Sequence, residues 1–212
     1  MAPDRAVRSA TALGPRAVHG VIDTELIPLV EDIARRLAGR QVATAESCTA
    51  GRVSTALACA DDAQSFLRGG LVSYQVQTKR RLLHVDADSV LSSEAAVEMA
   101  VGACHHLHAD VAVATTGLAG GEPQDGVEVG TVFIATCVSG RTAARRYRFD
   151  GDPLEVCDAA TRQALIDLAR ALRATENGDI GPSTGTVGTR PGSSEPTADI
   201  AQGVPNGHDA LR

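Results

Sequence analysis

A serine stands where a buried strand is predicted to turn into a helix. Residues 42–51 read Val-Ala-Thr-Ala-Glu-Ser-Cys-Thr-Ala-Gly, and Ser47 falls at the corner. A hydroxyl in this position lies beside backbone N–H groups that the new helix does not use. Such groups can stabilise the oxyanion that forms when a nucleophile attacks a carbonyl. Ser47 is therefore a candidate nucleophile. The alternative is that Ser47 or Thr49 is only the N-cap of the helix.

A serine nucleophile needs a base, and Lys79 is the candidate. His84 follows a predicted helix and three further histidines close another, so none of them is placed for this task. A lysine that is desolvated in a pocket loses its proton more readily and can accept one from a hydroxyl. The alternative is that Lys79 is an exposed helix residue beside two arginines.

The third stretch that could take part in binding or catalysis is a glycine-rich loop. The apolar run 111–115 is typical of a strand covered on both faces, and it leads into Thr116-Gly117-Leu118-Ala119-Gly120-Gly121. A strand that feeds such a loop can bring N–H groups close to a phosphate or carboxylate. The pattern is neither the dinucleotide fingerprint nor a Walker loop, and alone it is equally typical of an ordinary turn.

Apolar periodicity predicts the elements that must position these groups. Helical spacing begins at Thr24 and stops at Gly39, and a short strand over 41–45 leads to the corner. We expect the remaining elements in this order: a helix over 50–59 ended by 61–63, a turn and strand over 67–74, a helix over 76–83, a helix from Ser92, a strand over 111–115, a hairpin over 130–149 around Ser139-Gly140, and a helix from Asp152. The inner stripe of the helix from Ser92 is expected to consist of Ala96, Val97, Ala100, Val101 and Cys104.

Strands that alternate with helices and are followed by a hairpin indicate the α/β class. We expect a single three-layer α/β/α domain with a mixed sheet over residues 23–173. Residues 1–22 lack a clear period, and residues 174–212 are rich in Gly, Pro, Ser and Thr. Both segments are predicted to be disordered.

Charge and composition exclude several classes of partner. The chain has a formal net charge of −6 and only 2% aromatic residues, which argues against nucleic-acid binding. Its five cysteines form no Cys-x-x-Cys pair, so we expect reduced thiols in a cytoplasmic protein. The histidines at 105, 106 and 108 are explained as cations near a helix C-terminus, and no metal site is expected. No membrane span or signal peptide is recognisable.

These stretches together resemble the CinA C-terminal domain family, the nicotinamide-nucleotide amidohydrolases. The resemblance runs in order through Ala45–Gly51, Val72–Tyr74, Lys79, Thr116–Gly120 and Val129–Val132, and it covers about residues 24–172. The Ala-Glu-Ser-Cys-Thr corner and the ordered spacing are much more specific than the glycine-rich loop alone.

The resemblance implies a reaction and roles for individual residues. Enzymes of this family hydrolyse the carboxamide of nicotinamide mononucleotide to nicotinate mononucleotide and ammonia, with a Ser–Lys pair and without metal or cofactor. By motif position Ser47 would be the nucleophile, Lys79 the base and Tyr74 a neighbour that orients one of them. Cys48 is a rival nucleophile by chemistry, but the family's motif places the nucleophile at Ser47.

The same resemblance implies how the substrate is held. The partner would be a small-molecule nucleotide, and the assembly a homodimer or higher homo-oligomer. Independently of the resemblance, the N–H groups of Cys48 and Thr49 at the predicted helix start could hold the oxyanion of amide hydrolysis. The nucleotide pocket would be lined by Thr116, Gly117, Gly120 and Gly121.

The sequence departs from the family pattern where the phosphate is expected to bind. The family carries arginines at two positions that are occupied here by Pro153 and Cys157. Arg162 is the candidate substitute, with Arg146 and Arg148 as further possibilities, and the alternative is that all three lie on solvated faces. A second hypothesis is therefore a catalytically altered or inactive CinA-like protein with a ligand-binding or regulatory role linked to competence or DNA damage.

Overall fold

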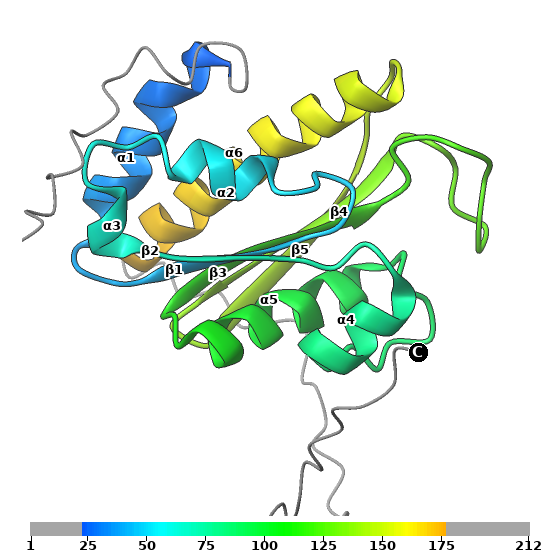
Figure 1. Cartoon of the computed structure of the whole chain (residues 1–212), viewed down its shortest axis with the longest axis horizontal. Coiled ribbons are helices and arrows are strands. Elements are labelled where there is room, and N and C mark those ends of the chain that lie inside the picture. Colours follow the sequence, from blue (N-terminus) through cyan, green and yellow to red (C-terminus); the bar gives the residue numbers. More distant parts are fainter. Residues whose placement is uncertain (1–22, 177–212) are drawn as a thin grey trace, which may run out of the picture.

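A five-stranded mixed sheet lies between two layers of helices (Figure 1). The computed structural model describes residues 23–176. Its elements in chain order are the 3₁₀ turn η2 (Thr24–Leu26), α1 (Ile27–Leu37), β1 (Val42–Glu46), α2 (Arg52–Leu57), α3 (Ala63–Phe66), β2 (Leu67–Val72), α4 (Val76–Leu83), α5 (Ser93–Leu107), β3 (Val111–Gly117), β4 (Thr131–Val138), β5 (Arg141–Arg148) and α6 (Pro153–Glu176). The predicted α/β class, three layers and mixed sheet are confirmed.

The sheet has the order β2-β1-β3-β4-β5. β1 runs parallel to β2 and β3, whereas β4 is antiparallel to β3 and to β5. The predicted hairpin is present, with Val138 opposite Arg141. Ser139 and Gly140 have positive φ angles of 50° and 79°, the backbone that a two-residue hairpin turn requires.

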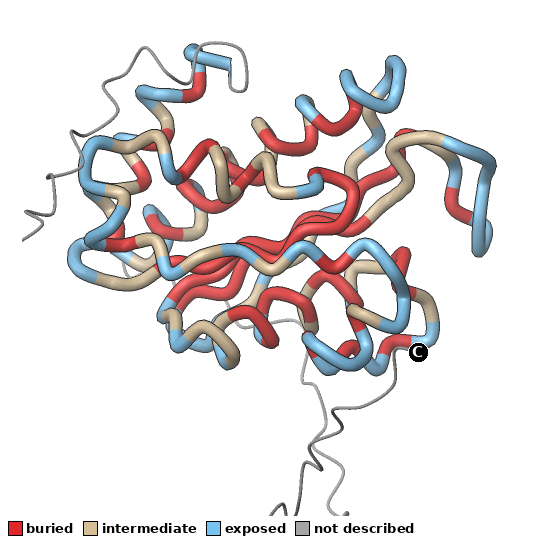
Figure 2. The backbone as a smooth tube through the Cα atoms, viewed as in Figure 1, coloured by how far each residue is buried: buried red, intermediate tan, exposed pale blue. Residues whose placement is uncertain are grey.

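Two apolar cores explain why the central strands read as continuous apolar runs. Larger residues of β1 and β3, such as Val42 and Val113, face α1, α2 and α6. Alternate residues of the same strands are alanines, and they face α5, whose inner side is also rich in alanine. Small residues on both surfaces let this helix approach the sheet closely. Figure 2 shows the buried sheet between its two covers.

The connections diverge at the carboxyl ends of β1 and β3. The chain leaves β1 through α2 and α3 on one face of the sheet, and it leaves β2 through α4 and α5 on the other. Open α/β sheets bind ligands where such connections diverge. This end of the sheet lies on the right of Figure 1, and Ser47 directly follows β1 there.

Several boundaries differ from the sequence prediction. The second helix begins at Arg52 rather than at residue 50, because Ala50 and Gly51 adopt left-handed backbone conformations. Residues 63–66 form the short helix α3, and Leu67 begins β2 instead of lying in a turn. On α5, Val101 is 45% exposed and Met99 is buried, so the predicted inner stripe was partly wrong.

The last helix extends beyond the predicted end of the domain. α6 continues to Glu176, whose carboxylate pairs with Arg36 at 2.6 Å. Residues 174–176 are therefore helical rather than part of a tail. The disorder predicted for 1–22 and for the rest of the tail falls outside the described residues. Between residues 23 and 176, no helix is long and apolar enough to cross a membrane.

Candidate active site

The side chains of Ser47 and Lys79 meet at the end of β1. Lys79 Nζ donates a hydrogen bond of 2.9 Å to Ser47 Oγ and another of 3.0 Å to the carbonyl of Tyr74. Lys79 is only 2% exposed, because it lies on the inward side of α4 one turn before the buried Leu83. The exposed-lysine alternative is therefore wrong. Burial lowers the pKa of Lys79, which favours the neutral amine that a base requires.

The loop after β1 is fixed to both its neighbours. Ser47 N–H donates to the carbonyl of Thr115 on β3 at 3.0 Å. The N-cap of α2 is Gly51, without a side-chain cap, so the interpretation of Ser47 or Thr49 as an N-cap is wrong. Within residues 23–176, the N–H groups of Cys48 and Thr49 donate no hydrogen bond. These two N–H groups are the candidates to hold an oxyanion.

Glu46 takes the place of the missing cap, and sequence reasoning gave it no role. Its fully buried carboxylate accepts hydrogen bonds from the N–H groups of Gly51 and Val53 at 2.9 and 3.1 Å. Ser54 donates from both its N–H and its hydroxyl, at 2.8 and 2.6 Å. The hydroxyls of Thr44 and Thr49 complete the set. The signal in the sequence was a carboxylate at the end of an otherwise uncharged strand.

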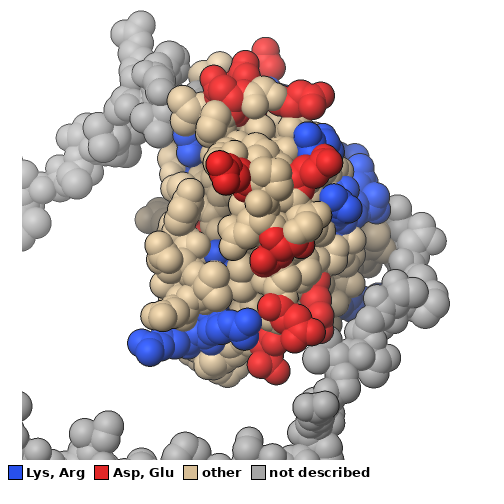
Figure 3. All heavy atoms as spheres, turned by 90° about the vertical axis from the view of Figure 1, so that its right-hand side faces the viewer, with Lys and Arg blue, Asp and Glu red and all other residues tan. Residues whose placement is uncertain are grey.

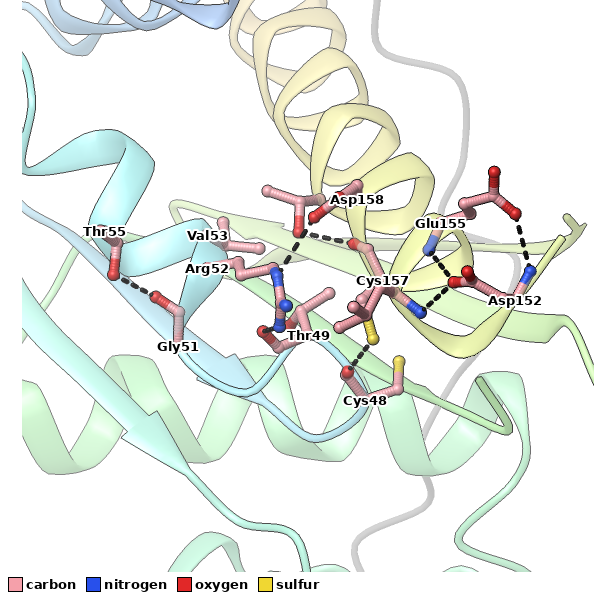
Figure 4. A network of polar contacts seen from close by, with 12 residues as sticks. Cys48, Thr49, Gly51, Arg52, Val53, Thr55, Asp152, Glu155, Cys157 and Asp158 are labelled. Atoms are coloured by element: carbon pink, nitrogen blue, oxygen red, sulfur yellow. Dashed lines mark hydrogen bonds and ion pairs between the residues drawn. The ribbon is translucent and has the colours of Figure 1, made fainter. Parts of the chain in front are cut away.

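Cys48 is buried in the apolar core that includes residues of α6. Burial, with a smaller contribution from Cys157, raises the pKa of the Cys48 thiol to about 12. The Cys157 thiol donates to the Cys48 carbonyl at 2.8 Å, as Figure 4 shows. A thiol that stays protonated at neutral pH is a poor nucleophile. Cys48 is therefore a packing residue whose backbone N–H borders the site.

Tyr74 is exposed, and its backbone contacts Lys79. The side chain is 69% exposed, and its carbonyl, not its hydroxyl, contacts Lys79. The residue thus positions Lys79 through the backbone and leaves its ring open to a ligand.

The glycine-rich loop is shaped by packing. Thr116 is buried and its hydroxyl donates to the carbonyl of Val90 at 2.8 Å, so that hydroxyl is engaged within the protein. A Cβ on Gly117 would lie 2.4 Å from a backbone oxygen of β4. A Cβ on Gly120 would lie 2.6 Å from Pro153 at the start of α6, and Gly121 needs its positive φ of 90°.

The arginines proposed from sequence do not meet at the Ser47 corner. Arg162 pairs with Asp23 and Glu25 near the start of the described chain. Arg148 pairs with Glu128, and Arg146 lies over the ring of Phe133 at 5.9 Å. Figure 3 looks onto the end of the molecule that holds the corner. Its centre is mostly uncharged, acidic side chains are scattered across it and basic ones gather toward its edges.

Arg52 is the arginine that sequence reasoning missed. Its Nε donates to Asp158 at 3.1 Å and its Nη1 donates to the carbonyl of Thr49 at 3.5 Å (Figure 4). The side chain leaves the first turn of α2 toward the first turns of α6. The sequence signal was an arginine directly after the Cys-Thr-Ala-Gly loop.

A metal ion has no evident place in the described part of the chain. His84 packs beside His105 and His106, with ring centroids 5.0–6.5 Å apart. Across residues 23–176, no group of three histidine, cysteine or acidic side chains is arranged to hold an ion.

Known proteins share this sequence and fold. Residues 27–172 match the family model of the CinA C-terminal domain. Protein YdeJ of Escherichia coli K12 is 36% identical over 161 residues, which cover 72% of this chain and 94% of YdeJ. A CinA-like protein of Mycobacterium marinum is 40% identical over 149 residues, which cover 66% of this chain and 35% of that protein.

A solved structure extends the similarity to three dimensions. The crystal structure of a competence-damaged protein (CinA) superfamily protein from Enterobacter cloacae has a TM-score of 0.67 at 34% identity. The match covers 69% of this chain and 92% of that one. The chain thus spans most of YdeJ and of the Enterobacter protein, but about a third of the mycobacterial relative.

Proposed function

This chain belongs to the CinA C-terminal domain family, and on that premise we propose that it is an amidohydrolase. Its substrate is nicotinamide mononucleotide, which it converts to nicotinate mononucleotide and ammonia in pyridine-nucleotide salvage. The observation that carries the proposal is the 2.9 Å contact between the buried Lys79 amine and the Ser47 hydroxyl. A hydroxyl paired with a desolvated amine is a base-activated nucleophile.

The first half of the reaction forms an acyl-enzyme. Neutral Lys79 takes the proton from Ser47 Oγ as that oxygen attacks the carboxamide carbon. The oxyanion that develops points at the N–H groups of Cys48 and Thr49, which no other acceptor in residues 23–176 uses. Collapse breaks the carbon–nitrogen bond, and the nitrogen leaves as ammonia with the proton that Lys79 held.

The second half releases the acid. Lys79, neutral again, takes a proton from a water molecule that attacks the ester carbon. The ester bond to Ser47 breaks, and Lys79 returns the proton to the serine oxygen. One base serves both halves, so loss of Lys79 should slow both. A positioned general base is typically worth about 10²–10⁴-fold in rate.

The same proposal includes the location, the assembly and the cofactor requirement of the enzyme. All five cysteines are free, which supports a reducing, cytoplasmic location. Resemblance to the family supports a homodimer or higher homo-oligomer. We assign no cofactor, because the Ser–Lys reaction needs only water as co-reactant.

One observation favours a second candidate function. The arginines expected to hold the substrate phosphate are replaced at Pro153 and Cys157, and Arg162 is engaged by two carboxylates. A ligand-binding or regulatory protein, in the competence or damage context that names the solved relatives, would tolerate this loss.

The test is product formation from nicotinamide mononucleotide. Purified protein is incubated with the mononucleotide in the presence of a chelator, and nicotinate mononucleotide and ammonia are quantified together. Equimolar appearance of both supports the deamidase. Ligand binding without either product, by correctly folded protein, supports the second function and contradicts the first.

A further inference from the structure

Arg52 occupies the junction between the Ser47 loop and α6. Its guanidinium contacts the carbonyl of Thr49, two residues beyond Ser47, and the carboxylate of Asp158 (Figure 4). Its charge also acts on Cys157: burial raises the pKa of that thiol, and Arg52 partly offsets the rise. The Arg52 cation therefore lies beside position 157, where the sequence lacks the arginine expected there.

The contacts of Arg52 leave it free to exchange partners. The side chain is 34% exposed and that of Asp158 is 71% exposed, so their ion pair is solvated and weak. Two of the five guanidinium N–H groups are directed to these contacts, and the others remain for a ligand. A phosphate dianion accepts two parallel guanidinium hydrogen bonds and carries more charge than a carboxylate.

We propose that Arg52 binds the phosphate of the substrate, with Asp158 as the group that the phosphate displaces. The inference rests on the proposed function, because it assumes that the carboxamide sits at Ser47. Lys79 approaches that serine from α4, whereas Arg52 approaches the same loop from α2 on the other face of the sheet. A mononucleotide lying across the Ser47 loop would place its amide beside Lys79 and its phosphate beside Arg52.

The experiment measures binding without turnover. In a Ser47→Ala background, affinities for nicotinamide mononucleotide and for nicotinamide riboside, which lacks the phosphate, are measured by calorimetry. Arg52→Met should weaken mononucleotide binding about tenfold or more, the usual loss of a charge-assisted contact, and leave the riboside unchanged. Arg52→Lys should bind the mononucleotide with an affinity between those of the Ser47→Ala parent and the Arg52→Met variant, because lysine keeps the charge without the planar guanidinium group.

Asp158→Asn gives a prediction of opposite sign. Removal of the competing carboxylate should tighten mononucleotide binding and again leave the riboside unchanged. Arg35→Met is the matched control, because Arg35 also pairs with an aspartate on an exposed surface but lies on α1. An unchanged ratio of the two affinities in both Arg52→Met and Asp158→Asn would overturn the role of Arg52 and leave the deamidase proposal standing. Absence of binding by either ligand would overturn both.

Discussion

Lys79 Nζ lies 2.9 Å from Ser47 Oγ and 3.0 Å from the carbonyl of Tyr74. The amine reaches the serine from α4, 32 residues further along the chain, while the serine is held at the end of β1 by its N–H bond to Thr115. A strand and a helix from separate parts of the chain, β1 and α4, therefore fix the distance between base and nucleophile.

The activity should rise with pH along a limb set by Lys79. The neutral amine is the active form, and burial holds its pKa below the ordinary value of 10.5. kcat/KM for the mononucleotide should therefore increase as pH rises, with a midpoint below pH 10.5. A limb whose midpoint lies at or above that value would show that Lys79 is not desolvated in the working enzyme.

Replacement of Lys79 should separate activity from stability. Lys79→Met should lower kcat by about 10²-fold or more, whereas the melting temperature at pH 7 should not fall below that of the wild type. The pKa of Lys79 is lower in the folded protein than in the unfolded chain. The charged amine therefore lowers the free energy of unfolding at pH values below the pKa of the unfolded chain, and this destabilisation is lost as the pH rises to that pKa.

The control for this prediction is the pH dependence of the melting temperature. Any gain in melting temperature from Lys79→Met should shrink between pH 7 and pH 10.5, because the folded wild-type amine loses its charge in this range before the unfolded one does. A large loss of stability at pH 7 would mean that Lys79 is mainly a structural residue.

Cys48 should be dispensable for chemistry. A thiol whose pKa is raised to about 12 is almost entirely protonated at neutral pH. Cys48→Ala should therefore keep kcat within about threefold of the wild type, with a loss of stability of about 1 kcal/mol for the smaller core residue. Iodoacetamide should fail to inactivate the folded enzyme through this residue. Rapid inactivation with labelled Cys48 would contradict the assignment.

Glu46 should be essential to the shape of the serine loop. An amide at this position would present N–H groups to donors that now meet a carboxylate, so Glu46→Gln should cost about 3 kcal/mol or more in the free energy of unfolding. Chemical denaturation measures the change. Glu31→Gln, on the exposed side of α1, is the control and should change stability by less than about 0.5 kcal/mol. Equal effects of the two variants would show that the buried network contributes little.

The sequence predicted the layers well because the apolar pattern is strong. The runs that form β1 and β3 are covered on both faces, and the Ser-Gly turn between β4 and β5 requires its backbone conformation. The short elements were not predicted correctly. α3 has only four residues, and the start of α2 is displaced by the left-handed Ala50 and Gly51.

The arginines could not be placed from sequence, because their partners are remote in the chain. Arg162 turns toward Asp23 and Glu25, which lie 139 and 137 residues away. Arg52 meets Asp158 across 106 residues through the packing of α2 on α6. Periodicity states which helix carries a side chain and roughly which side it takes, but not which other element covers that side.

The central claim is that Ser47 is the nucleophile of an amide hydrolysis. The most direct measurement is ammonia release from nicotinamide mononucleotide by the wild type and by Ser47→Ala, without added metal. Ser65→Ala, at an exposed serine of α3, serves as the control. We predict release by the wild type and the control and none above background by Ser47→Ala, with equal melting temperatures. Turnover retained by Ser47→Ala would contradict the account.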